Sequence, residues 1–210
     1  MKSPARATLL IASALVLLAA LGGCGYKVNY ALTPEFSTIR PGLVAVAPVV
    51  WETDAAPEAG DVKWLFRAMS TERLTSLNYR ALSIKEVDQR VRKAGARKVA
   101  EAAPADAARL LGVDAVLYIR VTGWDVDKFL TYASLSFSAA FELYSATGAR
   151  VWTAEYSTRE SDIRLDTETM ELAVLQTYEP RLQRFVDAIF ATLPPSEPTV
   201  TRERYFDWLP

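Results

Sequence analysis

Apolar residues in the first half of the chain form two short runs separated by a stretch with helical spacing. Residues 43–50, LVAVAPVV, are apolar on both faces and predict a central strand, and residues 79–83 predict a shorter one. Between them, apolar side chains over residues 62–77 recur three or four positions apart, which predicts a helix. This half therefore indicates a strand–helix–strand unit.

Two further helices are predicted before the pattern changes. Ser83 and Glu86 have the S-x-x-E spacing of a capping box, and Gly95 stands where a left-handed C-cap is favoured, so we expect a helix between Ser83 and Gly95. A shorter helix is expected from Pro104 to Gly112, because proline suits the first turn and glycine the position after the last.

In the second half the apolar period falls to two. Residues 113–129, 132–144 and 150–157 each predict a strand in an antiparallel meander, and Gly123 indicates a bulge in the first of them. An apolar helical stripe over residues 175–193 closes the pattern. The core-facing residues of the second strand are expected to be Ala133, Leu135, Phe137, Ala139, Phe141 and Leu143.

The order of these elements is strand, helix, strand, helix, helix, three strands and helix. A strand–helix–strand unit forms a parallel pair through a right-handed crossover, whereas strands joined by short links pair antiparallel. The sequence therefore predicts an α/β fold with a mixed sheet. The first unit would be parallel, the three-stranded meander antiparallel, and the helices would pack against the sheet.

The chain begins with a processing signal. Lys2 and Arg6 precede an uncharged run over residues 7–21 that ends in small residues, the layout of a secretory signal peptide. The LGGC that follows resembles a bacterial lipobox. By that resemblance residues 1–23 would be removed, and Cys24 would carry a diacylglyceryl group and an N-acyl chain, which together anchor stably where one chain does not. The alternatives are an uncleaved anchor and a buried free cysteine.

Three segments follow the signal. We expect residues 24–42 to comprise the lipidated cysteine and a polar tether, residues 43–195 a single α/β domain, and residues 196–210 an aromatic C-terminal tail. Disordered tails are usually polar, so the aromatic content of this one indicates docking. Docking on the chain's own core is slightly favoured over anchoring a partner, although aromatic side chains serve as interface hot spots. The tail residues concerned are Tyr205, Phe206, Trp208 and Leu209.

Composition removes several classes of function. The chain has no histidine, which excludes a histidine-dependent triad, a histidine-ligated zinc hydrolase site and a pH switch at the imidazole pKa. Cys24 is its single cysteine, so an intrachain disulfide is impossible. With 24 basic and 25 acidic residues it lacks the basic excess of a nucleic-acid-binding surface. No cofactor is expected beyond the covalent lipid.

Three polar clusters have the residue types of a site, and each has a simpler interpretation. Asp125 and Asp127 share a strand face, where paired carboxylates usually guard a sheet edge. Residues 159–171 are acidic but lack the spacing of a calcium loop. A row of three serines has no histidine to activate it and is expected to be the wetted face of the sheet. The row consists of Ser134, Ser136 and Ser138. We therefore expect no catalytic, cofactor-binding or metal-binding residue.

Several motifs in a fixed order resemble a known family. They are VAP at residues 46–48, GVDAVL at 112–117, and Gly148 followed by Trp152. These are similar to motifs of bacterial outer-membrane lipoproteins of unknown function that have the TolB N-terminal-like fold, a fold similar to the periplasmic domain of the curli secretion channel CsgG. The resemblance covers roughly residues 43–160, and its motifs are turn glycines and core residues.

The resemblance implies a lipoprotein of the outer membrane that faces the periplasm. Gly25 agrees with this, since the usual signal for retention in the inner membrane is an aspartate after the cysteine. The implied function is a non-catalytic interaction or assembly subunit of an envelope transport or secretion complex, with channel or ABC-transporter components as partners. The alternative is a lipoprotein activator of a peptidoglycan synthase, for which residues 25–42 form a short tether. An enzyme is disfavoured by the absent histidines and nucleotide-binding motifs.

Overall fold

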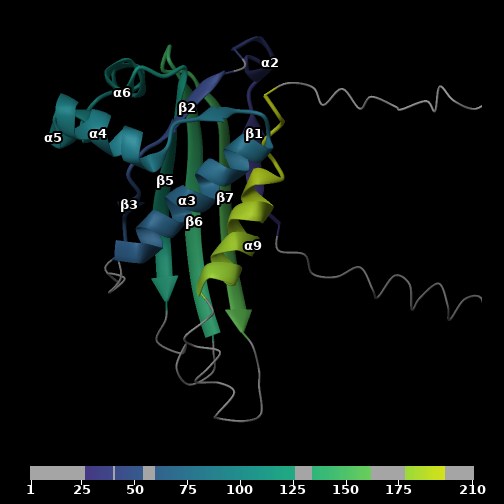
Figure 1. The fold of residues 1–210 in the computed structure, drawn as a ribbon. Coiled ribbons are helices and arrows are strands. Elements are labelled where there is room, and N and C mark those ends of the chain that lie inside the picture. The colour runs from purple at the N-terminus through teal and green to yellow at the C-terminus, as the bar shows by residue number, and fades with distance from the viewer. Residues whose placement is uncertain (1–26, 40, 54–59, 126–133, 162–177, 197–210) are drawn as a thin grey trace, which may run out of the picture.

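The computed structural model describes residues 27–39, 41–53, 60–125, 134–161 and 178–196. These residues form a seven-stranded mixed sheet with helices packed against it, which confirms the predicted α/β class (Figure 1).

The sheet combines parallel and antiparallel pairing. Its strands are β1 (Asn29–Leu32), β2 (Leu43–Val46), β3 (Val50–Trp51), β4 (Arg80–Ala81), β5 (Ala115–Asp125), β6 (Ser134–Ser145) and β7 (Arg150–Ser161). They lie in the order β1–β7–β6–β5–β2–β4, and β3 also pairs with β5. The pairs among β2, β3, β4 and β5 are parallel, whereas β5–β6, β6–β7 and β7–β1 are antiparallel. The expected parallel unit and antiparallel meander are both present.

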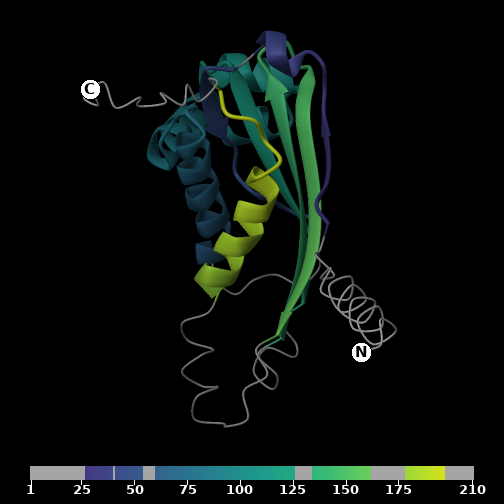
Figure 2. The same cartoon turned by 90° about the vertical axis from the view of Figure 1, so that its right-hand side faces the viewer.

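The helices of the described residues cover the two faces of the sheet unequally. They are α2 (Phe36–Ile39), α3 (Gly60–Ser76), α4 (Ile84–Ala94), α5 (Ala96–Ala100), α6 (Pro104–Leu111) and α9 (Tyr178–Phe190). α3 and α9 lie side by side across one face (Figure 2). α4, α5 and α6 pack against one another over the opposite face, where they cover β2 and the beginning of β5.

Alternate residues of β2 face two separate hydrophobic cores. Val44 and Val46 belong to the larger core beneath α3 and α9, whereas Ala45 and Ala47 belong to a smaller core beneath α4, α5 and α6. The first part of β5 alternates in the same way, so both strands are apolar on both faces where they pair. In the larger core the fully buried Trp152 of β7 donates an Nε1–H hydrogen bond to the Thr192 hydroxyl after α9 over 3.1 Å.

Several local features follow the sequence closely. The Ser83 hydroxyl accepts a hydrogen bond from the Glu86 backbone N–H, and the Glu86 carboxylate accepts one from the Ser83 backbone, so the capping box of α4 is complete. Gly112 ends α6 with a left-handed φ of 62°. The β5–β6 register shifts at Gly123, as predicted, and a Cβ there would lie 2.5 Å from the Ser138 hydroxyl.

The segment expected to be a tether is partly folded. Residues 29–32 form β1, which pairs antiparallel with residues 152–155 of β7, and Phe36 of α2 is buried. The expectation of a tether extending to residue 42 is therefore wrong for this stretch. All four β1 side chains are exposed, so this edge strand is held mainly by its backbone hydrogen bonds to β7. A strand without buried side chains has no alternating apolar pattern, and the sequence therefore did not predict it.

Strand boundaries differ from expectation where proline intervenes. The run 43–50 is divided into β2 and β3, with Pro48 in the gap, since proline cannot donate the ladder hydrogen bond there.

The end of β7 also differs from the prediction. The strand extends to Ser161, beyond the predicted end at residue 157. Ala133 and residues 126–129 and 175–177 lie outside the described part of the chain.

Tyr79 ties the start of β4 to the segment after α9. Its side chain is buried, and its hydroxyl donates a hydrogen bond to the Pro194 carbonyl over 2.6 Å. Burial raises the pKa of the Tyr79 phenol well above its usual range. The folded protein therefore keeps this proton at pH values where the unfolded chain loses it.

This difference predicts an alkaline loss of stability. Below about pH 10 the contribution of Tyr79 is fully present, and above it the free energy of unfolding falls by up to about 1.4 kcal/mol per pH unit. Tyr79→Phe should remove that part of the slope, at a cost of about 1 kcal/mol near neutral pH from the lost hydrogen bond. Urea unfolding across the alkaline range, with the exposed Tyr30→Phe as control, measures both. Equal slopes in all three proteins would contradict the assignment.

Candidate functional site

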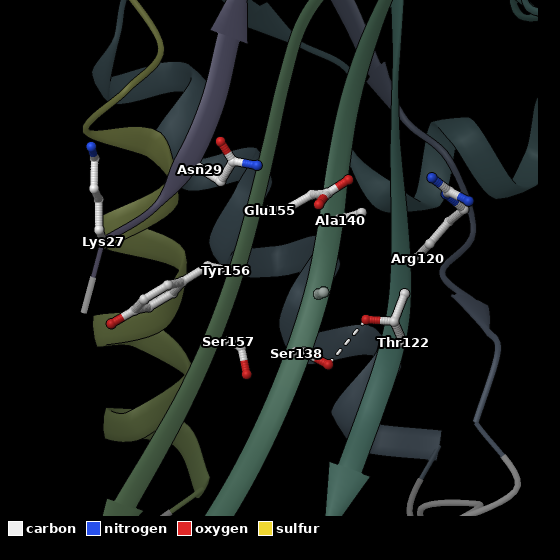
Figure 3. Close-up of a pocket in the computed structure, with 10 residues that line it drawn as sticks. Lys27, Asn29, Arg120, Thr122, Ser138, Ala140, Glu155, Tyr156 and Ser157 are labelled. Atoms are coloured by element: carbon white, nitrogen blue, oxygen red, sulfur yellow. Dashed lines mark hydrogen bonds between the residues drawn. The ribbon is translucent and has the colours of Figure 1, made fainter.

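The helices α4, α5 and α6 leave the later part of β5 and the neighbouring parts of β6, β7 and β1 uncovered on the outer face, and an open hollow of about 500 Å³ lies there (Figure 3). Because side chains alternate along a strand, this face carries the polar half of each strand. Thr122 of β5 and Ser138 of β6 point toward one another and their hydroxyls are 3.0 Å apart. The lining residues are Lys27, Asn29, Arg120, Thr122, Ser138, Ala139, Ala140, Glu155, Tyr156 and Ser157.

An ion-pair network borders this hollow. Glu142 of β6 lies between two arginines, 2.9 Å from Arg150 and 3.4 Å from Arg120, and Arg120 also reaches Glu52 over 3.4 Å. The hydrogen bond with Glu142 is the main cause that raises the pKa of Arg150. The Arg120 Nε is buried and makes no hydrogen bond within the described residues. The border therefore presents charges of both signs in fixed positions, which suits recognition of a polar surface.

A second cavity lies beneath α4, α5 and α6 and is apolar. It has a volume of about 360 Å³, and its walls come from three helices, two strands and the β2–β3 connection. We call it the apolar pocket, and it is lined by Ala47, Pro48, Val49, Val50, Val91, Ala96, Val99, Ala107, Leu111, Val116 and Tyr118.

Tyr118 is the one lining residue of the apolar pocket with a polar side chain. Its ring meets the Tyr144 ring edge to face, with centroids 5.7 Å apart. The Tyr118 hydroxyl is buried and has no hydrogen-bond partner within the described residues. Burial, followed by the neighbouring Tyr144, raises the pKa of Tyr118, so the phenol remains a hydrogen-bond donor at neutral pH.

Most residues singled out in the sequence lie outside the described part of the chain. These are Cys24, Asp127, Tyr205, Phe206, Trp208 and Leu209. Asp125 is exposed at the end of β5, and only residues 159–161 of the acidic segment are described. The lipidation site, the tail and the carboxylate pair therefore stay predictions.

The serine row lies on β6. Ser136 and Ser138 are half-buried on the uncovered face, and Ser138 is engaged with Thr122. Ser134 belongs to the same strand. The described residues contain no group of three or more Cys, Asp or Glu residues placed to hold a metal ion. Among the described helices, none has the length and apolar character needed to span a membrane.

Neither cavity is evident from the sequence. The apolar pocket draws its walls from separate segments, each of which has only an ordinary core pattern, and the hollow lies on the part of the outer sheet face that these helices do not cover. Alternating polar residues on β6 and β7 indicate a wetted face, but they do not indicate that a hollow forms there.

No protein-family model matches the chain, and no curated protein matches it either. Similar solved structures include lipoprotein GNA1162 from Neisseria meningitidis, at 20% identity over 70% of this chain and 99% of that one, with a TM-score of 0.50. The PelC dodecamer from Paraburkholderia phytofirmans follows at 17% identity, over 76% and 98%, with a TM-score of 0.43. A DUF4136 family protein from Bacteroides thetaiotaomicron is 14% identical over 77% and 98%, with a TM-score of 0.40. The Neisseria lipoprotein has a similar fold.

The ion-pair network predicts a measurable stability effect. Glu142→Ala leaves Arg120 and Arg150 without their shared carboxylate, which is only 12% exposed, so the free energy of unfolding should fall by about 1 kcal/mol. Glu101→Ala, which removes the exposed pair with Arg97, is the control and should change it by less than about 0.5 kcal/mol. Urea unfolding compares the two, and equal effects would show that the network contributes no more than a surface pair.

Proposed function

We propose that this protein is a lipid-anchored, non-catalytic subunit of an envelope transport or secretion complex, held at the outer membrane and facing the periplasm. The observation that carries the proposal is the sequence LGGC at residues 21–24, placed after a basic start and an uncharged apolar run. The similar fold of the Neisseria lipoprotein supports it at the level of fold alone.

The position of β1 bears on how far the domain stands from its anchor. β1 begins at Asn29, so only residues 25–28 separate Cys24 from the sheet. Even fully extended, five steps of chain span at most about 17 Å. A domain anchored at Cys24 therefore lies against the bilayer surface. This disfavours the alternative function, a peptidoglycan synthase activator, which needs a tether long enough to cross the peptidoglycan.

The uncovered hollow is the surface that we assign to the partner. It lies beside β1 and therefore close to the proposed anchor, since Lys27 and Asn29 form part of its lining. Its hydroxyls and its bordering charges of both signs fit a protein surface better than a nucleic acid, which would require a basic excess. With no histidine in the chain, binding is a better supported role than acid–base catalysis.

The anchor is tested by metabolic labelling with an alkyne fatty acid. The wild-type chain should carry the label and Cys24→Ser should carry none. Gly25→Asp is the matched control: it should keep the label but move from the outer-membrane to the inner-membrane fraction on a density gradient. Label on Cys24→Ser would refute lipidation at this residue, and an unchanged fraction for Gly25→Asp would argue against sorting through the residue after the cysteine.

The partner surface is tested by crosslinking the membrane-anchored chain and identifying what is captured. Ser138→Arg fills the hollow and should reduce capture of a channel or ABC-transporter component at least tenfold. Thr75→Arg, on the exposed side of α3, should leave capture unchanged. Both variants should melt within a few degrees of the wild type. Undiminished capture by Ser138→Arg would remove the hollow from the interface, and recovery of a penicillin-binding protein would favour the alternative function.

A further inference from the structure

We propose that the C-terminal tail of the same molecule occupies the apolar pocket, with residues 205–209 inserted between α4, α5, α6 and the sheet. This inference does not depend on the lipid anchor or on the partner. It rests on the chemistry of the pocket, on where the described chain ends, and on the composition of the residues that follow.

The walls of the pocket match the apolar side chains of the tail. Every lining residue except Tyr118 is aliphatic or proline. The last nine residues, RERYFDWLP, contain three aromatic residues and a leucine. Burying such side chains is favourable, and a few of them together can offset the ordering of a short segment. The pocket volume of about 360 Å³ lies in the range of sites that take small apolar groups.

The Tyr118 hydroxyl indicates that the occupant also has a hydrogen-bond acceptor. Tyr118 lines the pocket, and its hydroxyl is buried and unpartnered within the described residues. Buried hydroxyl groups almost always have a hydrogen-bond partner, because an unpartnered one has lost its hydrogen bonds to water without replacement. An extended peptide offers a backbone carbonyl at each residue, so the inserted tail would accept this hydrogen bond while its side chains fill the apolar space.

The tail is long enough to reach the pocket. The described chain ends at Ser196, whose N–H donates to the Leu77 carbonyl over 2.9 Å and whose hydroxyl lies 3.5 Å from the Pro41 carbonyl. From Pro41 the chain runs through β2 to Val49 at the pocket, eight steps that span at most about 28 Å. The twelve steps from Ser196 to residue 208 span up to about 42 Å. The extended tail is therefore longer than the path from Ser196 to the pocket, which leaves room for a turn.

Disulfide trapping in the full chain tests the proposal. Cys24→Ser removes the single cysteine of the chain. In that background, the pair Val50→Cys and Asp207→Cys can form a disulfide only where the tail contacts the pocket. Val50 lines the pocket and is 46% exposed. We expect mild oxidation to form an intrachain disulfide in most molecules, read by intact mass and by non-reducing electrophoresis. The control pair Tyr30→Cys and Asp207→Cys places the first thiol on β1, at the opposite edge of the sheet, and should form at least fivefold less.

Three outcomes would overturn the proposal. Equal trapping by both pairs would mean that the tail has no preferred site, and an interchain disulfide from the first pair would assign the pocket to the tail of a second copy. The third concerns blocking: Ala96→Trp, at the pocket, should slow trapping at least fivefold, whereas Lys98→Trp on the same helix should not. Equal rates in these two variants would place the tail elsewhere.

A thermodynamic cycle tests the hydrogen bond separately. Tyr118→Phe should lower the melting temperature of the chain with its native tail by a few degrees. In a chain carrying Phe206→Ser and Trp208→Ser, which cannot fill the pocket, the same substitution should leave the melting temperature unchanged. Equal shifts in the two backgrounds would show that the tail does not accept from Tyr118.

Discussion

The parallel pairing of β2 with β5 is the contact on which the rest of the structure depends. Where these two strands pair they are apolar on both faces, so each contributes alternate side chains to two different cores. A strand of this kind requires helices on both sides. The crossover through α3 covers one face, and the chain through α4, α5 and α6 covers the other before it enters β5. The two cores are thus joined through a single pair of strands.

The unequal cover of the sheet follows from the same arrangement. After β5 the chain turns into an antiparallel meander, and α9 adds cover only on the side of α3. The far side of β6, β7 and β1 therefore carries polar residues and remains open, which creates the hollow. The apolar pocket forms where the short helices meet the end of β2, because Pro48 interrupts the strand there and the helices do not close over the gap. Both cavities therefore lie where the helices stop covering the sheet.

Much of the fold could be predicted from the sequence, because its signals are local. The capping box of Ser83 and Glu86, the bulge at Gly123 and the alternation along β6 each require only neighbouring residues to be recognised. β1 could not be predicted, because an edge strand with four exposed residues has no apolar period. The cavities could not be predicted either, since their walls come from distant segments. The proposed lipidation site differs from the cavities in this respect, because Cys24 is inferred from the sequence alone and lies outside the described residues.

β1 also determines how mechanical load would enter a molecule held at Cys24. A pull from the anchor first reaches the chain at Asn29 and passes into the four-residue β1–β7 ladder, which the Thr33 N–H extends by one hydrogen bond to the Val151 carbonyl. The exposed side chains of β1 add little burial to these bonds. β1 would therefore separate from β7 before either core is strained, and its release would lengthen the link to the membrane by several residues. In a chain anchored at Cys24, this edge strand would therefore yield to force before the two cores do.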